Sequence, residues 1–166
     1  MYALFTSTDV KTQMIDLDLV LAYAHHTAIF LLISVMAAEW ILLRPGLSGP
    51  RLVQLVRVDS AYGIVAGLVI ASGLARVFLG HAGAGYYGAN WVFWGKMGLF
   101  ALAGILSVPA TLAILRWNKA RKTDAAFAPA DTEVMPHRRL LYAQFAVTLA
   151  IPLFGLAMGR GYGMMG

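Results

Sequence analysis

Ionisable side chains interrupt the long apolar runs of this sequence at a few positions, and these are the residues that could carry chemistry. His25 and His26 lie within the first run, Arg76 lies near the end of the second, and Lys96 lies near the start of the third. Ionisable side chains are costly in an apolar environment, so each one marks a functional site by default. Two imidazoles and two cations are therefore the first candidates.

Imidazole together with arginine and lysine can hold a b-type haem inside a helical bundle. A neutral imidazole ligates the iron, and Arg76 and Lys96 would neutralise the two propionates. At about 100° per residue, Glu39 returns to within about 40° of the face of His25, whereas His26 points away from that face. His25 is therefore the predicted ligand of the haem iron. The predicted cofactor-binding residues are His25, Lys96, Arg76 and His26, and no catalytic residue is assigned.

Two other interpretations fit the same histidines. The pair could bind copper with the methionines near the C-terminus, whose thioethers suit that metal, although their spacing forms no metal cage. A histidine in a membrane helix can also simply hydrogen-bond a neighbouring helix. Covalent c-type haem, iron–sulfur clusters, thiolate catalysis and disulfides are excluded because the chain has no cysteine.

A second charged layer is predicted closer to the opposite membrane face, from Glu39, Arg57 and Asp59. We expect Glu39 to meet Arg57 across the contact between the first two helices. The rise of an α-helix places this layer roughly 20 Å from His25. A structural role in packing is therefore predicted for it.

The composition is that of an integral membrane protein. Of the 166 residues, 60% are hydrophobic and 13% are charged, and the mean hydropathy is +0.70. The hydrophobic share is higher, and the charged share lower, than in an ordinary soluble domain. The net charge of +5 does not indicate nucleic-acid binding, because the basic residues lie beside apolar runs, where they set topology and contact anionic lipids.

Four apolar runs predict an all-α, integral membrane four-helix bundle that forms a single domain over residues 1–166. The predicted spans are about 19–43, 52–79, 91–117 and 140–158, and residues 118–136 form the predicted cytoplasmic loop. Glycines four residues apart, at 63 and 67 and at 155 and 159, predict close helix packing.

The distribution of basic residues predicts the orientation of the bundle. Nine of the 13 lie in or beside the two connections on one side, which the positive-inside rule assigns to the cytoplasm. Both termini are therefore predicted to be extracytoplasmic. The nine residues are Arg44, Arg51, Arg57, Arg116, Lys119, Arg121, Lys122, Arg138 and Arg139.

A series of motifs along nearly the whole chain resembles a bacterial family of predicted inner-membrane proteins, domain of unknown function 2214. That resemblance implies a multi-pass protein of the bacterial inner membrane and no particular activity. The motifs are Tyr23-x-His25, Ala38-Glu39, Arg57-x-Asp59-x-x-Tyr62-Gly63, Gly73-Leu74-x-Arg76-Val77, Asn90-x-x-Phe93-Trp94-x-Lys96 and Leu106-Ser107-x-Pro109-x-Thr111.

The layout is also distantly similar to that of the HemJ-type protoporphyrinogen IX oxidases. In those proteins a histidine of the first span and a lysine of the third are implicated in haem binding, so the likeness implies that His25 and Lys96 form the pair on the iron side. The chain departs from that pattern in the fourth span, where it has Leu140-Leu141-Tyr142-Ala143-Gln144 in place of Asn-Glu. The likeness therefore implies haem binding more than porphyrinogen oxidation.

The leading hypothesis is a haem-b-binding inner-membrane redox protein, which transfers electrons or carries out a porphyrin- or quinone-linked oxidation. Its partners would be the lipid bilayer and a quinone or another membrane protein, and a homo-oligomer is compatible with it. The alternative is a cofactor-free accessory subunit of a larger respiratory or photosynthetic complex. A small transporter is the third hypothesis, although four spans are few and no inverted repeat is visible.

Overall fold

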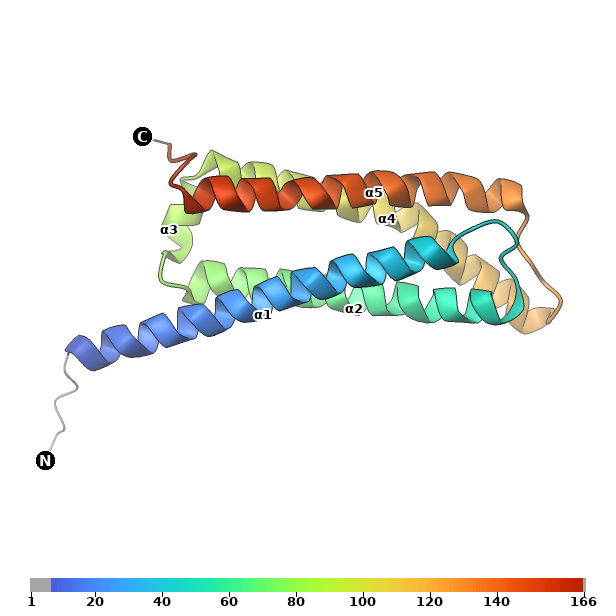
Figure 1. The fold of residues 1–166 in the computed structure, drawn as a ribbon, viewed down its shortest axis with the longest axis horizontal. Coiled ribbons are helices and arrows are strands. Elements are labelled where there is room, and N and C mark those ends of the chain that lie inside the picture. The colour runs from blue at the N-terminus through green and yellow to red at the C-terminus, as the bar shows by residue number, and fades with distance from the viewer. Residues whose placement is uncertain (1–6, 166) are drawn as a thin grey trace, which may run out of the picture.

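The computed structural model describes the backbone of residues 7–165 and the side chains from Leu17 to Met165. This part of the chain is helical and contains no strand: α1 (Ser7–Leu42), α2 (Gly49–Leu79), α3 (Gly83–Gly88), α4 (Trp91–Thr123) and α5 (Asp131–Gly159). Four of these helices, α1 from Leu17 onward, α2, α4 and α5, are long and apolar enough to cross a membrane. The predicted all-α membrane bundle is confirmed (Figure 1).

The long helices extend beyond the predicted spans. The segment predicted as a cytoplasmic loop contributes its first residues to α4 and its last to α5, which leaves only residues 124–130 outside a helix. Asp131 and Glu133 lie in the first turn of α5, where carboxylates interact favourably with the positive end of the helix dipole. Hydropathy alone underestimates these helices because their ends are polar.

The bundle is built from two antiparallel helix pairs. α1 packs mainly against α2 and α4 mainly against α5, while fewer contacts join α2 to α4 and α1 to α5. Figure 1 shows the two pairs converging where the α1–α2 and α4–α5 connections lie, and separating toward α3. We call these two ends of the bundle the loop end and the α3 end.

An apolar cluster of buried residues from the α1–α2 connection, α2, α4 and α5 fills the loop end. Trp117 is its largest member and is 1% exposed. The buried members are Leu43, Leu47, Leu52, Leu55, Ala113, Ile114, Trp117, Val134 and Leu141. A second, smaller cluster near the middle of the bundle contains Ala28, Leu32, Met36 and Val69, and it draws buried residues from α1 and α2 alone.

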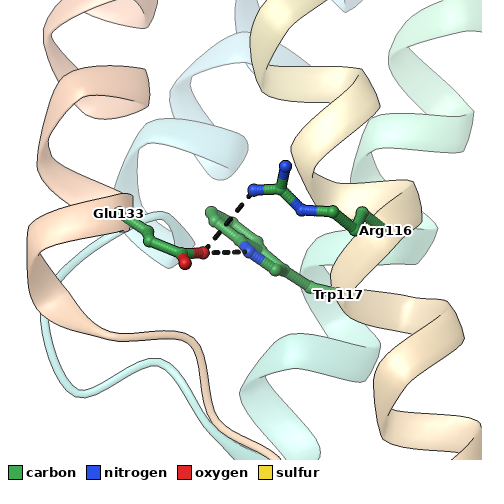
Figure 2. Close-up of polar contacts among 3 residues, drawn as sticks. All are labelled: Arg116, Trp117 and Glu133. Carbon is green, nitrogen blue, oxygen red and sulfur yellow. Dashed lines mark hydrogen bonds and ion pairs between the residues drawn. The ribbon is translucent and has the colours of Figure 1, made fainter.

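Polar contacts tie the helices together at the loop end. Trp117 donates its Nε1–H to the Glu133 carboxylate at 3.0 Å, and Arg116 forms an ion pair with the same oxygen at 3.5 Å (Figure 2). Arg138 of α5 donates to the carbonyl oxygens of Trp40 and Leu43 at 2.9 and 2.7 Å, at the C-terminal end of α1. Carbonyl groups there have no partner within their own helix, so Arg138 links α5 to α1.

The glycine pairs do not pack as predicted within this chain. A Cβ atom added at Gly63, Gly67, Gly155 or Gly159 would meet nothing within 4 Å. The four-residue spacing is present, but these positions lie on helix faces turned away from the neighbouring helices. Other glycines make close approaches between helices: a Cβ atom at Gly73 would lie 3.2 Å from the His25 ring, and one at Gly95 would lie 2.7 Å from the Phe154 ring.

Candidate functional site

His25 faces the interior of the α1–α2 pair and is 6% exposed. Its Nδ1 lies 3.0 Å from Ser72 Oγ, and the Ser72 hydroxyl donates its hydrogen to the Leu68 carbonyl oxygen at 2.7 Å. The Ser72 oxygen can therefore accept a hydrogen bond from His25 Nδ1–H. In that tautomer the lone pair of Nε2 is left for a ligand.

His26 occupies the opposite face of α1. It is exposed, and its Nδ1 donates to the Ala22 carbonyl oxygen of its own helix at 2.6 Å. The prediction that His25 faces inward while His26 points away is confirmed. The structure does not bring His26 to the other predicted site residues.

Arg76 and Lys96 join His25 at the α3 end, and we call these three residues the cation layer. Arg76 lies in the last turn of α2, and its Nε is buried and has no hydrogen-bond partner among the described residues. Lys96 lies on α4 and is half-buried. Both cations act electrostatically on the His25 ring, and Arg76 acts on Lys96. Within residues 17–165, neither one forms an ion pair.

A buried cap positions the helix that carries Lys96. Asn90 is fully buried, and its Oδ1 accepts hydrogen bonds from the backbone N–H groups of Val92 and Phe93 at 2.9 and 3.2 Å. Its amide group donates to the Tyr162 carbonyl oxygen at 3.1 Å, so the start of α4 is tied to the turn after α5. Lys96 therefore projects from a helix whose first turn is fixed.

Asp18 is a carboxylate of α1 near this end, and it hydrogen-bonds the backbone. It accepts a hydrogen bond from the His81 backbone N–H at 3.2 Å, in the turn between α2 and α3. A Cβ atom at Gly80 would lie 2.9 Å from the same Asp18 oxygen, so the turn passes close to it. Asp18 thus holds the end of α2, and no carboxylate among residues 17–165 forms an ion pair with the cation layer.

Closer to the loop end, five polar side chains from all four long helices gather in the interior; we call them the core carboxylate cluster. Glu39 of α1 and Asp59 of α2 are 3% and 6% exposed, and Asp59 acts electrostatically on Glu39. Thr111 of α4 donates to Asp59 Oδ1 at 2.7 Å, and Gln144 of α5 donates to the Tyr62 hydroxyl at 2.8 Å.

The predicted pair between Glu39 and Arg57 is wrong. Arg57 is exposed and lines an open surface pocket together with Arg121, and the ion pair that the described residues contain joins Arg116 to Glu133 instead. Residues two apart on a helix point to different faces. Since Asp59 faces the core, Arg57 must face outward. The three residues predicted to form one layer are therefore separated, with Glu39 and Asp59 in the core and Arg57 at the surface.

Four residues near these groups were not predicted from the sequence: Ser72, Tyr62, Thr111 and Gln144. Tyr62 follows Asp59 by three residues, which places both on one helix face, and Gln144 is an amide within an apolar span. Uncharged polar residues in membrane helices commonly hydrogen-bond across helices. A search for such residues at helical spacing from Asp59 would have found Tyr62.

Comparison with protein families gives one match over most of the chain. A family model described as "Predicted membrane protein (DUF2214)" matches residues 17–163. Comparison with curated proteins and with solved structures found no match.

Proposed function

Because the chain belongs to the DUF2214 family of predicted membrane proteins, whose description states no activity, we propose a function from the geometry of its own residues: a haem-b-binding redox protein of the bacterial inner membrane. When bound, haem b supplies a reversible one-electron couple. The cation layer would hold it. Electron transfer with a quinone, or a porphyrin- or quinone-linked oxidation, is the class of reaction that this site would serve.

The observation that carries the proposal is the hydrogen-bond network of His25. A ligating histidine characteristically gives its other ring N–H to a nearby acceptor, which fixes the tautomer and the ring orientation. Ser72 Oγ, 3.0 Å from Nδ1, is that acceptor, so Nε2 is the ligating nitrogen. Gly73 contributes by leaving space beside the ring, since a Cβ atom there would lie 3.2 Å from Cε1.

The two cations fit the anionic edge of the same cofactor. Arg76 has a buried Nε without an acceptor, and an unmatched buried donor costs about 1–3 kcal/mol. Lys96 is the other cation of the layer, and each is exposed to the charge of the other. A ligand with two carboxylates would give Arg76 a hydrogen-bond acceptor and would also offset the positive charges of Arg76 and Lys96. Arg76 and Lys96 would therefore bind the propionates, while His25 ligates the iron.

The direct test is the absorption spectrum of the full-length protein, expressed with haem supply and purified in detergent. We expect a Soret band and dithionite-sensitive visible bands in the parent and in His26→Ala, and loss of haem from His25→Ala. His26→Ala is the matched control because the two imidazoles are adjacent on α1. A folded, colourless parent protein would overturn the proposal and favour the cofactor-free accessory subunit.

Lys96→Met separates the two roles that a lysine could have in this site. An ammonium that binds a propionate leaves the visible spectrum unchanged and weakens haem retention, which is the result we expect. A neutral amine could instead ligate iron, and its removal would change the spectrum. If Lys96→Met has both the spectrum and the haem retention of the parent, Lys96 does not take part in haem binding.

The proposed orientation has both termini on the extracytoplasmic side, with the α3 end and its cation layer facing outward. The basic residues that flank the loop end support it through the positive-inside rule. A reporter protein that is active only in the cytoplasm, fused after Gly166, should be silent. The same reporter inserted between Ala125 and Ala126, in the α4–α5 connection, should be active. The opposite pattern would show that both termini and the α3 end face the cytoplasm.

A further inference from the structure

The core carboxylate cluster contains two buried carboxyl groups and no basic side chain among its five members. Asp59 is the charged group that acts on Glu39. α4 and α5 face this pair with the neutral hydroxyl of Thr111 and the neutral amide of Gln144. Tyr62 is the further titratable group of the cluster. Within residues 17–165, no ion pair is formed by either carboxylate.

Two unpaired carboxylates in this position need a positive ligand. The effective cost of placing an ion in a protein interior is several kcal/mol, and a second charge of the same sign adds to it. Arg57 cannot supply the balance, because it is exposed and lies with Arg121 at a surface pocket. A cation bound between the carboxyl groups, or a proton on one of them, would remove this cost.

Gln144 independently indicates that something is bound here. Its side chain is 1% exposed, Nε2 donates to the Tyr62 hydroxyl at 2.8 Å, and Oε1 is buried without a partner among the described residues. The amide of Gln144 therefore uses its N–H group toward Tyr62, and its carbonyl oxygen is the atom left without a partner.

The unpartnered atom is thus a carbonyl oxygen, which binds electron-poor ligands. It lies in a cluster whose other groups are two carboxylates, a phenol and a threonine hydroxyl, so the available ligand atoms are all oxygen. Oxygen donors select hard cations over soft transition metals. We propose that Glu39, Asp59 and Gln144 form a binding site for one small monovalent cation, a proton or Na⁺, in the core of the bundle. This site does not depend on haem binding.

Two measurements on the purified full-length protein test the site and distinguish its two possible ligands. The first is infrared spectroscopy of the carbonyl stretch of protonated carboxyl groups, followed over the neutral pH range. The second is thermal unfolding in NaCl compared with choline chloride at equal ionic strength. The variants are Glu39→Gln and Asp59→Asn, and the control is Glu133→Gln, an exposed carboxylate in the first turn of α5.

If the ligand is a proton, the parent protein shows a protonated carboxyl band at neutral pH. Glu39→Gln or Asp59→Asn removes that band, and Glu133→Gln keeps it. If the ligand is Na⁺, the parent unfolds at a higher temperature in NaCl, and the shift grows with the logarithm of its concentration above the dissociation constant. Glu39→Gln loses this shift and Glu133→Gln retains it.

The proposal is overturned if the parent shows neither a protonated carboxyl band nor stabilisation by Na⁺. It is also overturned if a band or a sodium effect persists in both Glu39→Gln and Asp59→Asn. The measurements on the parent protein decide the question even if both variants fail to fold. Because neither signal requires haem, failure of the haem proposal leaves this test intact.

Discussion

The two ends of the bundle differ in packing and in charge. At the loop end, an apolar cluster from the α1–α2 connection, α2, α4 and α5 contains Trp117, and Arg138 ties α5 to the end of α1. At the α3 end, His25 is held within the α1–α2 pair, and Lys96 reaches the same layer from α4. The loop end is therefore the part of the bundle where apolar side chains pack together, and the α3 end is the part where polar side chains of α1, α2 and α4 gather.

The cation layer and the core carboxylate cluster also differ in the sign of their charged groups. Among residues 17–165, neither Arg76 nor Lys96 of the cation layer forms an ion pair with a carboxylate, and neither Glu39 nor Asp59 of the core carboxylate cluster forms one with a cation. Opposite charges would neutralise each other if they were in contact. Fourteen residues separate His25 from Glu39 on α1, or roughly 20 Å of helix rise. The two proposed ligands, an anionic one for the cation layer and a cationic one for the core carboxylate cluster, therefore occupy separate sites.

The largest expected effect is on the stability of the loop end. Trp117→Ala removes the largest buried side chain of the apolar cluster at the loop end, and such truncations cost about 3–5 kcal/mol. We expect a loss of that size in the free energy of unfolding, measured by titration with a denaturing detergent. Trp91→Ala is the control, because Trp91 is 58% exposed. Equal losses in both variants would show that the loop end is no more tightly packed than the surface.

A smaller effect is expected from Arg76→Met, which keeps the apolar length of the side chain and removes its charge. A charge-assisted hydrogen bond contributes about 1.5–3 kcal/mol, so haem affinity should fall about 10- to 100-fold with an unchanged visible spectrum. The measurement is the transfer of haem to a soluble acceptor protein. Arg160→Met, an exposed arginine after α5, should retain the parent affinity. If both variants lose haem equally, general charge and not the cation layer accounts for retention.

The smallest effect compares two glycines of α2. Gly73→Ala places a methyl group 3.2 Å from the His25 ring, and Gly67→Ala places one in open space. Both substitutions gain about 0.5–1 kcal/mol of helix propensity, so the difference between them isolates the contact with His25. We expect a severalfold loss of haem affinity, with a small spectral shift, in Gly73→Ala alone. Identical behaviour of the two variants would mean that the His25 ring position is not critical.

Sequence alone determined the class of fold. Four apolar runs and the absence of cysteine were sufficient to predict the membrane helices and to exclude thiol chemistry, because a membrane-spanning backbone must satisfy its own hydrogen bonds. The helical period also predicted which histidine faces inward, since His25 and His26 differ by one position on the same helix. These inferences need only the geometry of a single helix.

Contacts between helices were decided by the tertiary structure alone. The partner of His25 is Ser72, 47 residues away, and Thr111 lies 52 residues from Asp59. The expected pair of Glu39 and Arg57 failed because helix rotation turns Arg57 outward when Asp59 faces the core. The spacing of Gly63 and Gly67 was correct for packing, but it could not say whether a neighbouring helix lies on that face. Periodicity fixes the relative directions of side chains on one helix, whereas the rotation of each helix about its axis depends on the packing of all four.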